Sequence, residues 1–435
     1  MMLSRLSFFP LFCGLFVVTH SWTIRELGYV AIPNPAFTSV QVHPGTGRYD
    51  VTCTTFSSSP LVADRVMVIR DVGGQIAQNG ASNLEVEVLS GGHKWPNELD
   101  KVPDDVFGRN DLWWLGTGFL VPTKTDGIIA LIDADEDTQD GPAPTYDITS
   151  SPLITQEWFY HHVSFVDADG DGRKDALSAR AYVPLDGGPI AAQMVWHKHP
   201  ESGDPLTSTW EEFPLFDGPD AGFCYYEIPL QNGLTRYVIF STQYFLEKLV
   251  MSWYDGTSPD FYNLQHKVLD ATPEERYFDC ELADMNADGD LELLITANSD
   301  TNGKLLIYEP MRNKDWPEGE WTKHVIADGF KPNVPEITEG NGSPGRARSM
   351  YPKIPVDRKK PMILMTGDDD NNAYLFEAVK DNDPEDWTYT KHVIFQANEG
   401  TVGAISYADI DGDGLAEIFI PAYSDGRLHV MTFEP

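Results

Sequence analysis

The chain has 435 residues, and its charge is strongly unbalanced: 67 aspartates and glutamates against 31 lysines and arginines give a formal net charge of −36. Binding to nucleic acid or to an anionic membrane depends on a basic surface, so this composition argues against both kinds of partner. Hydrophobic residues make up 41% of the chain, which is enough for a large folded core and too much for an acidic disordered tail.

The first 21 residues have the pattern of a secretory signal peptide. Arg5 precedes an apolar run from Leu6 to Val18, and small polar residues follow up to Ser21. A membrane-spanning helix needs about 20 apolar residues, and this run is shorter. We therefore expect cleavage after Ser21 and a secreted, extracellular protein without membrane insertion.

The cysteines set a limit on disulfide bonding. Cys13 leaves with the signal peptide, and Cys53, Cys224 and Cys280 remain in an oxidising compartment, where they allow at most one intramolecular disulfide. An apolar core must therefore hold the fold together. The single glycosylation sequon begins at Asn341 and is weakened by the proline directly after it, so it indicates a surface loop at most.

A pair of short strands recurs seven times along the chain, about every 60 residues. Both strands are rich in β-branched and aromatic residues and are bounded by Gly, Asn, Asp or Pro, with no competing helical period. The earlier strand of each pair begins at Tyr49, Asp111, Asp175, Arg236, Leu291, Pro361 and Ala416. The later strand begins at Arg65, Ile128, Gln193, Lys248, Lys304, Ala373 and Arg427.

The two ends of the chain indicate a closed ring. Another strand follows most pairs, most clearly at 321–326 and 389–394, but the last repeat ends at Pro435 with no room for it. Its counterpart, 22–27, stands at the opposite end of the chain. An open solenoid or two sandwiches would not displace a strand in this way. The sequence predicts an all-β, seven-bladed β-propeller of four-stranded blades, a single domain over 22–435 closed by its N-terminal strand.

Three loops between the first and second strands of a blade have ligand spacing for a hard cation. Each has Asp or Asn at positions 1, 3 and 5, Gly at position 6, a main-chain carbonyl at position 7 and Asp or Glu at position 9. Ca²⁺ accepts six to eight oxygen ligands in flexible geometry, so we expect about three calcium ions with a structural role. The ligand positions are Asp167, Asp169, Asp171, Arg173 and Asp175; Asp284, Asn286, Asp288, Asp290 and Glu292; and Asp409, Asp411, Asp413, Leu415 and Glu417.

These loops resemble the calcium-binding FG-GAP and VCBS-type repeats known from integrin α-chain propellers and many secreted proteins. The resemblance covers the mature chain as a blade period and its specific motif only at the three loops; the Phe-Gly and Gly-Ala-Pro words are absent, as are the integrin stalk and membrane segment. It implies calcium on one rim and ligand contacts on the opposite face. Similar repeats also build carbohydrate-active enzymes, including fungal aldos-2-ulose dehydratase and some polysaccharide lyases, so the resemblance is compatible with binding and with catalysis.

The residues that enter each first strand are expected to line the channel mouth opposite the loops. Arg346 and Arg348 lie two apart on a strand, so they point the same way and can hold one carboxylate. With His161 and His162 they are the candidate catalytic residues, suited to acid–base work on an anionic sugar. The alternative is that the arginines balance nearby carboxylates. The full set is His161, His162, Tyr225, Arg276, Asp279, Arg346, Arg348 and Glu399.

A second pair of histidines lies at the end of a strand. His197 and His199 are spaced i, i+2, a spacing that brings two imidazoles to one strand face and that zinc sites use. Because polar residues emerge into a turn at a strand end, we favour the interpretation that both are surface residues.

Together these patterns predict a monomeric, secreted, calcium-binding propeller whose partner is a glycan or an extracellular protein of the matrix or cell surface, and not a nucleic acid. The first alternative is a carbohydrate lyase or dehydratase with its site at the channel mouth. The second is an acidic, calcium-rich component of the extracellular matrix.

Overall fold

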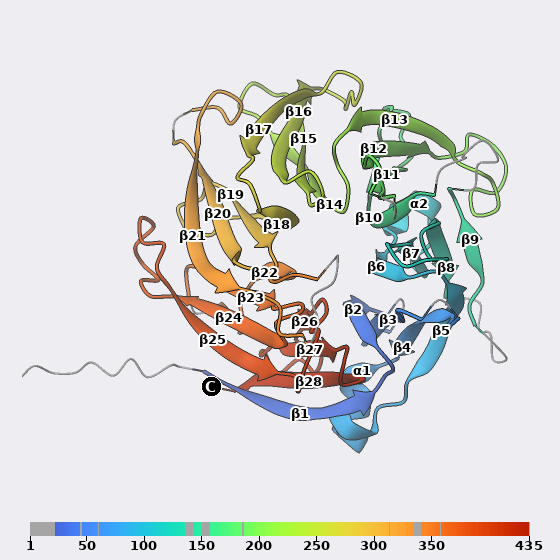
Figure 1. The fold of residues 1–435 in the computed structure, drawn as a ribbon, viewed down its shortest axis with the longest axis vertical. Coiled ribbons are helices and arrows are strands. Elements are labelled where there is room, and N and C mark those ends of the chain that lie inside the picture. The colour runs from blue at the N-terminus through green and yellow to red at the C-terminus, as the bar shows by residue number, and fades with distance from the viewer. Residues whose placement is uncertain are drawn as a thin grey trace, which may run out of the picture.

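The computed structural model describes residues 22–434, except 44–45, 60, 135–141, 150–156, 185–186, 313, 335–340 and 357. Seven four-stranded antiparallel sheets stand as blades around a central axis (Figure 1). The predicted seven-bladed β-propeller is thereby confirmed. The expected signal peptide, 1–21, lies outside the described residues.

Six blades consist of four consecutive strands, with the first strand nearest the axis (Figure 1). Blades 1 to 3 are β2 (Pro35–Val42), β3 (Tyr49–Thr55), β4 (Asp64–Ile69) and β5 (Glu87–His93); β6 (Pro96–Lys101), β7 (Leu112–Thr117), β8 (Ile129–Asp133) and β9 (Thr145–Asp147); and β10 (Phe159–Val166), β11 (Asp175–Tyr182), β12 (Ala191–Lys198) and β13 (Glu211–Asp217). Blades 4 to 6 are β14 (Gly222–Pro229), β15 (Thr235–Gln243), β16 (Lys248–Gly256) and β17 (Gln265–Asp270); β18 (Arg276–Ala283), β19 (Glu292–Asn298), β20 (Gly303–Pro310) and β21 (Trp321–Phe330); and β22 (Ala347–Met350), β23 (Met362–Thr366), β24 (Asn372–Ala378) and β25 (Tyr389–Gln396).

Blade 7 joins the two ends of the chain, as the sequence predicts. It consists of β26 (Ser406–Ala408), β27 (Glu417–Ala422), β28 (Arg427–Glu434) and, outermost, β1 (Thr23–Ala31). β1 pairs antiparallel with β28, with Thr23 opposite Glu434 and Ala31 opposite Arg427 (Figure 1). This closure leaves the ring without an open end.

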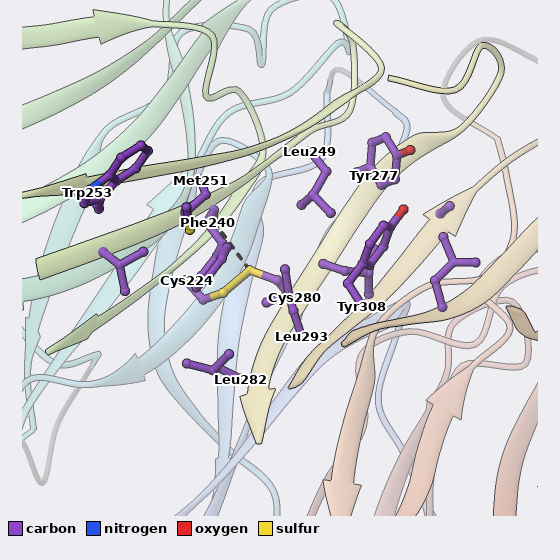
Figure 2. Packing of buried hydrophobic residues seen from close by; sticks show 14 residues of the cluster. Cys224, Phe240, Leu249, Met251, Trp253, Tyr277, Cys280, Leu282, Leu293 and Tyr308 are labelled. Atoms are coloured by element: carbon purple, nitrogen blue, oxygen red, sulfur yellow. Dashed lines mark hydrogen bonds between the residues drawn. A yellow bond between two sulfur atoms is a disulfide. The ribbon is translucent and has the colours of Figure 1, made fainter. Parts of the chain in front are cut away.

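The core is divided among the interfaces between blades. The buried apolar side chains of the described residues form seven large clusters, one between each pair of neighbouring blades. Each sheet is therefore covered on both faces, which is why a strand such as β7, in which all six residues are buried, is a continuous apolar run. The cluster between blades 4 and 5 includes Phe240 and Trp253 of blade 4 and Tyr277 and Tyr308 of blade 5 (Figure 2).

One disulfide forms among the three cysteines that follow the expected signal peptide. Cys224 of β14 is bonded to Cys280 of β18, so the bond joins the first strands of blades 4 and 5 (Figure 2). Cys53 is free and buried, and burial raises the pKa of its thiol to about 12. A thiol of this kind is unreactive at neutral pH.

Short helices interrupt the strand pattern in blades 1 and 2. α1 (Val72–Asn79) and the 3₁₀ turn η1 (Ala81–Asn83) connect β4 to β5, and α2 (Asp104–Phe107) connects β6 to β7. No helical period in the sequence indicates them, since the longest has eight residues and contains two glycines. Of the helices in the described residues, none has the length and apolarity that a membrane crossing requires.

Candidate functional site

The three acidic loops fold in the same way. In the first loop the Asp167 carboxylate accepts the backbone N–H groups of Asp171 at 3.0 Å and of Gly172 at 2.9 Å. The position-6 glycines have φ values of +88° (Gly172), +93° (Gly289) and +88° (Gly414). This conformation favours glycine, which explains the spacing seen in the sequence.

The donor groups of these loops fit a cation. Carboxylate oxygens of Asp167, Asp169 and Asp175 all lie within 4.8 Å of one another, as do those of Asp409, Asp411 and Glu417. The second loop has Asn286 in the corresponding place at position 3.

The position-9 carboxyl groups of the three loops are buried and lack a cationic side chain. Burial raises their pKa to about 6 in Asp175, about 8 in Glu292 and about 7 in Glu417. No Lys or Arg of the described chain forms an ion pair with them, so a bound cation would supply the missing positive charge.

In blades 1 and 2 an aspartate paired with an arginine stands in place of the acidic loop. Asp50 of β3 accepts the backbone N–H of Asp71 at 2.8 Å, just as Asp175 accepts that of His199 at 2.7 Å, so the two carboxylates are equivalent. Arg70 pairs with Asp50 at 3.4 Å. In blade 2, Arg109 likewise donates to Asp111. In both blades a guanidinium group pairs with an aspartate near the start of the second strand, whereas in the acidic loops cations pair only with other carboxylates, as Lys198 does with Asp169.

The candidate catalytic residues come together in the channel. A cavity of about 320 Å³, here called the inner cavity, is lined by all four of them, together with Glu98 of β6 and Asp279 of β18. The four residues are His161, His162, Arg346 and Arg348. Tyr225 also lines this cavity, whereas Arg276 and Glu399 do not. The assignment of a catalytic role to the four residues stays a prediction.

The charged groups of the inner cavity pair with one another. His162 Nδ1 lies 2.8 Å from Glu98 Oε2, and Arg346 lies 2.7 Å from Glu98 Oε1. Both arginines hold a single carboxylate, as their spacing predicts, but it is the protein's own Asp279. Burial acts to raise the pKa of Glu98, and Arg346, His162 and His161 together hold it well below its ordinary value. An anionic sugar would have to displace these internal pairs.

His161 differs from its neighbours because none of the described residues forms a hydrogen bond with its ring. The residue is 9% exposed, and its ring makes edge contacts with Phe37 at 5.4 Å and Phe278 at 6.1 Å. Burial lowers the pKa of His161 to about 4, so the imidazole is neutral at neutral pH. His161 and Phe278 line both the inner cavity and a second cavity at the channel mouth.

This second cavity, the aromatic bowl, has a volume of about 370 Å³. Its walls follow the ends of the second strands, and the acidic loops precede the starts of those strands, so the bowl and the loops lie on opposite faces of the ring. The aromatic residues that line it are Phe37, Phe56, Trp95, Phe119, Tyr244, Phe245, Phe278 and Tyr423.

Ring contacts connect most of these residues into a closed belt. Neighbouring ring centroids lie between 4.1 and 6.3 Å apart, and Trp95 is stacked between Phe56 and Phe119. The belt runs through Phe119, Trp95, Phe56, Phe37, His161, Phe278, Tyr244, Phe245, Phe159 and back to Phe119. These residues belong to blades 1 to 5.

The other side of the bowl is polar. Asn341, Asp368, Asp369 and Thr401 line it from blades 6 and 7 and the segment before them. The Asp369 carboxylate accepts hydrogen bonds from Asn341 Nδ2 at 2.8 Å and from Thr401 Oγ1 at 2.5 Å. The bowl thus places aromatic faces opposite hydrogen-bonding groups. Sequence analysis assigned none of its aromatic residues a role.

The interpretation of His197 and His199 as surface residues is wrong. His197 is fully buried and His199 is 8% exposed, because β13 pairs along β12 and Phe107 and Trp210 pack against the His199 ring. Neither histidine belongs to a group of metal-ligating side chains in the described part of the chain. Both are core residues.

The buried His197 predicts a pH dependence of stability. Burial lowers the pKa of this imidazole to about 3, so below its ordinary pKa of about 6.5 the unfolded chain binds a proton that the folded chain does not. Folding therefore loses stability as the pH falls below about 6.5. In His197→Met the loss of unfolding free energy between pH 7 and pH 5 should be smaller by about 2 kcal/mol, as measured by urea unfolding. An equal loss in both proteins would contradict this.

The fold and the cavities define a seven-bladed propeller with three acidic loops on one face and an aromatic bowl at the channel mouth on the other. No family model and no curated protein matches the chain. Solved structures that it is similar to include an α-L-arabinofuranosidase of Fusarium graminearum (11% identity, 94% of this chain and 98% of that chain, TM-score 0.43). Others are the N-terminal domain of Nup159 (7%, 95% and 96%, TM-score 0.48) and an ulvan lyase bound to its saccharide (12%, 93% and 94%, TM-score 0.41). At these values no activity carries over to this chain.

Proposed function

We propose that this protein is a secreted, calcium-stabilised propeller of the FG-GAP/VCBS type that binds a glycan in the aromatic bowl. The observation that supports this most strongly is the belt of aromatic rings facing a polar wall. A pyranose ring has apolar C–H faces and a rim of hydroxyl groups, so it matches a site with aromatic rings on one side and hydrogen-bonding groups on the other.

Calcium and secretion belong to the same proposal. The ligand positions of the three loops would hold Ca²⁺, with the carbonyls of Arg173, Asp290 and Leu415 as additional oxygen donors. The loops lie at the face opposite the bowl, so the ions would fix the blades without touching the ligand. The Cys224–Cys280 disulfide supports an oxidising compartment.

The glycan proposal predicts that removing rings from the bowl weakens binding. Phe119→Ala and Phe278→Ala should each lower the affinity for a bound oligosaccharide by about fivefold or more, because each removes an apolar surface from the aromatic wall of the bowl. Affinities would be measured by titration calorimetry with oligosaccharides of neutral, amino and uronic sugars, after a first screen on a glycan array.

A matched control separates this effect from a general loss of aromatic surface. Tyr262 is 61% exposed and lies outside the bowl, so Tyr262→Ala should leave the affinity unchanged. Thermal melting would verify that each variant is folded. Unchanged binding by both Phe variants, or binding only to an extracellular protein, would contradict the proposal.

A carbohydrate lyase or dehydratase is the second candidate, and His161 is the observation that favours it. The His161 imidazole is neutral and forms no hydrogen bond within the described residues. It can therefore accept the proton of a C–H group whose carbon is bonded to a carbonyl or carboxylate carbon. The electrons of that C–H bond form a C=C bond while a neighbouring C–O bond breaks. Ultraviolet-absorbing unsaturated products in the same incubations would favour this candidate over simple binding.

A further inference from the structure

We propose that the aromatic bowl selects sugars that carry a positive charge, namely oligosaccharides of amino sugars with free ammonium groups, over neutral and acidic ones. The inference rests on the proposed glycan-binding function of the same cavity and names the class of its ligand.

The titratable groups on the polar wall of the bowl are acidic. Asp368 and Asp369 stand on its polar wall, and its lining, so far as the chain is described, includes neither Lys nor Arg. Two cations touch aromatic residues of the bowl from outside: Lys124 lies 5.9 Å from the Trp95 ring, and Arg276 lies 5.3 Å from the Tyr244 ring. Each has a carboxylate partner of its own, Asp64 for the lysine and Asp300 for the arginine. Neither neutralises the polar wall.

The two aspartates differ in what they can offer a ligand. The Asp369 carboxylate already accepts hydrogen bonds from Asn341, Thr401 and the backbone N–H of Gly342. The Asp368 carboxyl accepts none from the described residues, and it lines the bowl. Asp368 is therefore the group that a ligand would meet.

The backbone holds Asp368 in place. Its φ is +55°, and its carbonyl accepts the N–H of Val402 at 2.9 Å, which ties the turn after β23 to blade 7. Burial, together with the neighbouring Asp369 and Asp370, raises the pKa of Asp368 well above its ordinary range. An ammonium group brought beside this carboxyl would stabilise its ionised form and gain a charge-assisted hydrogen bond.

The aromatic wall adds to the same selectivity. Cations are attracted to the faces of aromatic rings, whereas anions are not. A uronic acid would bring a carboxylate towards the Asp369 carboxylate, which would repel it, and would further disfavour ionisation of Asp368. A neutral N-acetylated sugar could stack on the rings but would leave the Asp368 carboxyl without a charged partner.

The test compares three pentasaccharides by titration calorimetry at neutral pH and about 0.15 M salt: those of glucosamine, N-acetylglucosamine and galacturonate. We expect the glucosamine pentamer to bind at least about tenfold more tightly than the N-acetylated one, the effect of one charge-assisted hydrogen bond. The galacturonate pentamer should bind most weakly. Asp368→Asn should reduce the preference for glucosamine to about twofold or less, and asparagine tolerates the positive φ at this position.

Two controls exclude a general attraction of polycations to an acidic protein. Asp328→Asn removes an equal charge from an exposed position in the outer strand β21, so it should keep the full preference. Pentalysine should bind weakly and without dependence on Asp368.

The outcomes separate the two proposals. Equal or tighter binding of the N-acetylated pentamer, or a glucosamine preference that survives in Asp368→Asn, would overturn the charge selectivity while glycan binding stands. Binding of pentalysine as tight as that of the glucosamine pentamer would overturn it as well. If none of the three saccharides binds, the charge selectivity fails, and the glycan proposal fails with it only if the glycan array also shows no bound saccharide.

Discussion

Removal of calcium should lower the free energy of unfolding by about 2.7 kcal/mol for each loop that is held at a hundredfold excess of calcium over its Kd, and by about 8 kcal/mol for three loops. The reason is that only the folded chain assembles the ligand positions, such as Asp167, Asp169 and Asp175 in the first loop. At about 2.1 cal/mol/K of unfolding entropy per residue, the melting temperature should fall by about 9 °C. Differential scanning calorimetry with and without a chelator would measure the change.

Two comparisons make this test specific. Mg²⁺ demands stricter octahedral geometry than Ca²⁺, so calcium should restore the melting temperature and magnesium should not. Asp167→Asn keeps a side-chain oxygen for only one of the N–H groups of Asp171 and Gly172. In chelator it should therefore cost about one hydrogen bond, about 1 kcal/mol, and in calcium it should cost clearly more because the ion also loses a charged ligand. A melting temperature that is unchanged by the chelator would contradict calcium binding. A variant that is equally destabilised in calcium and in chelator would contradict it as well.

The second large effect concerns a buried ion pair beside the bowl. Lys124, in the connection between β7 and β8, donates to Asp64 Oδ2 at 2.7 Å and to the carbonyl of Ser57 at 2.8 Å. The two side chains are 4% and 1% exposed. Lys124→Met would leave the Asp64 carboxylate buried without a counter-charge, and we expect it to cost about 3 to 5 kcal/mol of unfolding free energy. Urea unfolding would measure the loss.

A double variant identifies the cause. In Lys124→Met with Asp64→Asn no uncompensated charge remains, so most of the lost stability should return. Asp64 also accepts the backbone N–H of Trp95 at 2.9 Å, so the single variant should disturb the aromatic belt and weaken glycan binding too. A single variant within about 1 kcal/mol of the wild type would show that the pair does not stabilise the fold.

The features that sequence reasoning found are those in which the chemistry repeats locally. The strands of a blade are covered on both faces, so each appears as a short apolar run, and seven such pairs define the ring. The position-6 glycine and the position-9 carboxylate of each acidic loop lie three residues apart, for example Gly172 and Asp175. Spacing of this kind is visible in the sequence without knowledge of the fold.

The features that it missed are created by packing between distant segments. The aromatic belt is assembled from residues between Phe37 and Phe278 that belong to different blades. Phe37, His161 and Phe278 each stand third in a first strand, but the strand pattern alone does not show that their rings meet. Glu98 pairs with His162 across 64 residues. The position of His197 near the end of a strand favours the surface, but the neighbouring strand β13 and the Tyr160 ring of β10 cover it. Only the assembled blades show these contacts.

The closure of blade 7 has a consequence for the nascent chain during its synthesis. β1 is made first, and its partner β28 ends at Glu434, so the two strands are separated by nearly the whole chain. At translation rates of about 5 to 20 residues per second, synthesis of the chain between β1 and β28 takes about 20 to 80 s, and β1 has no partner strand during this time. Arg25 and Glu26 place charges on the waiting strand, a device that discourages pairing with other chains. The nascent protein therefore carries an unpaired strand until β28 is made, and its risk of aggregation is concentrated in that interval.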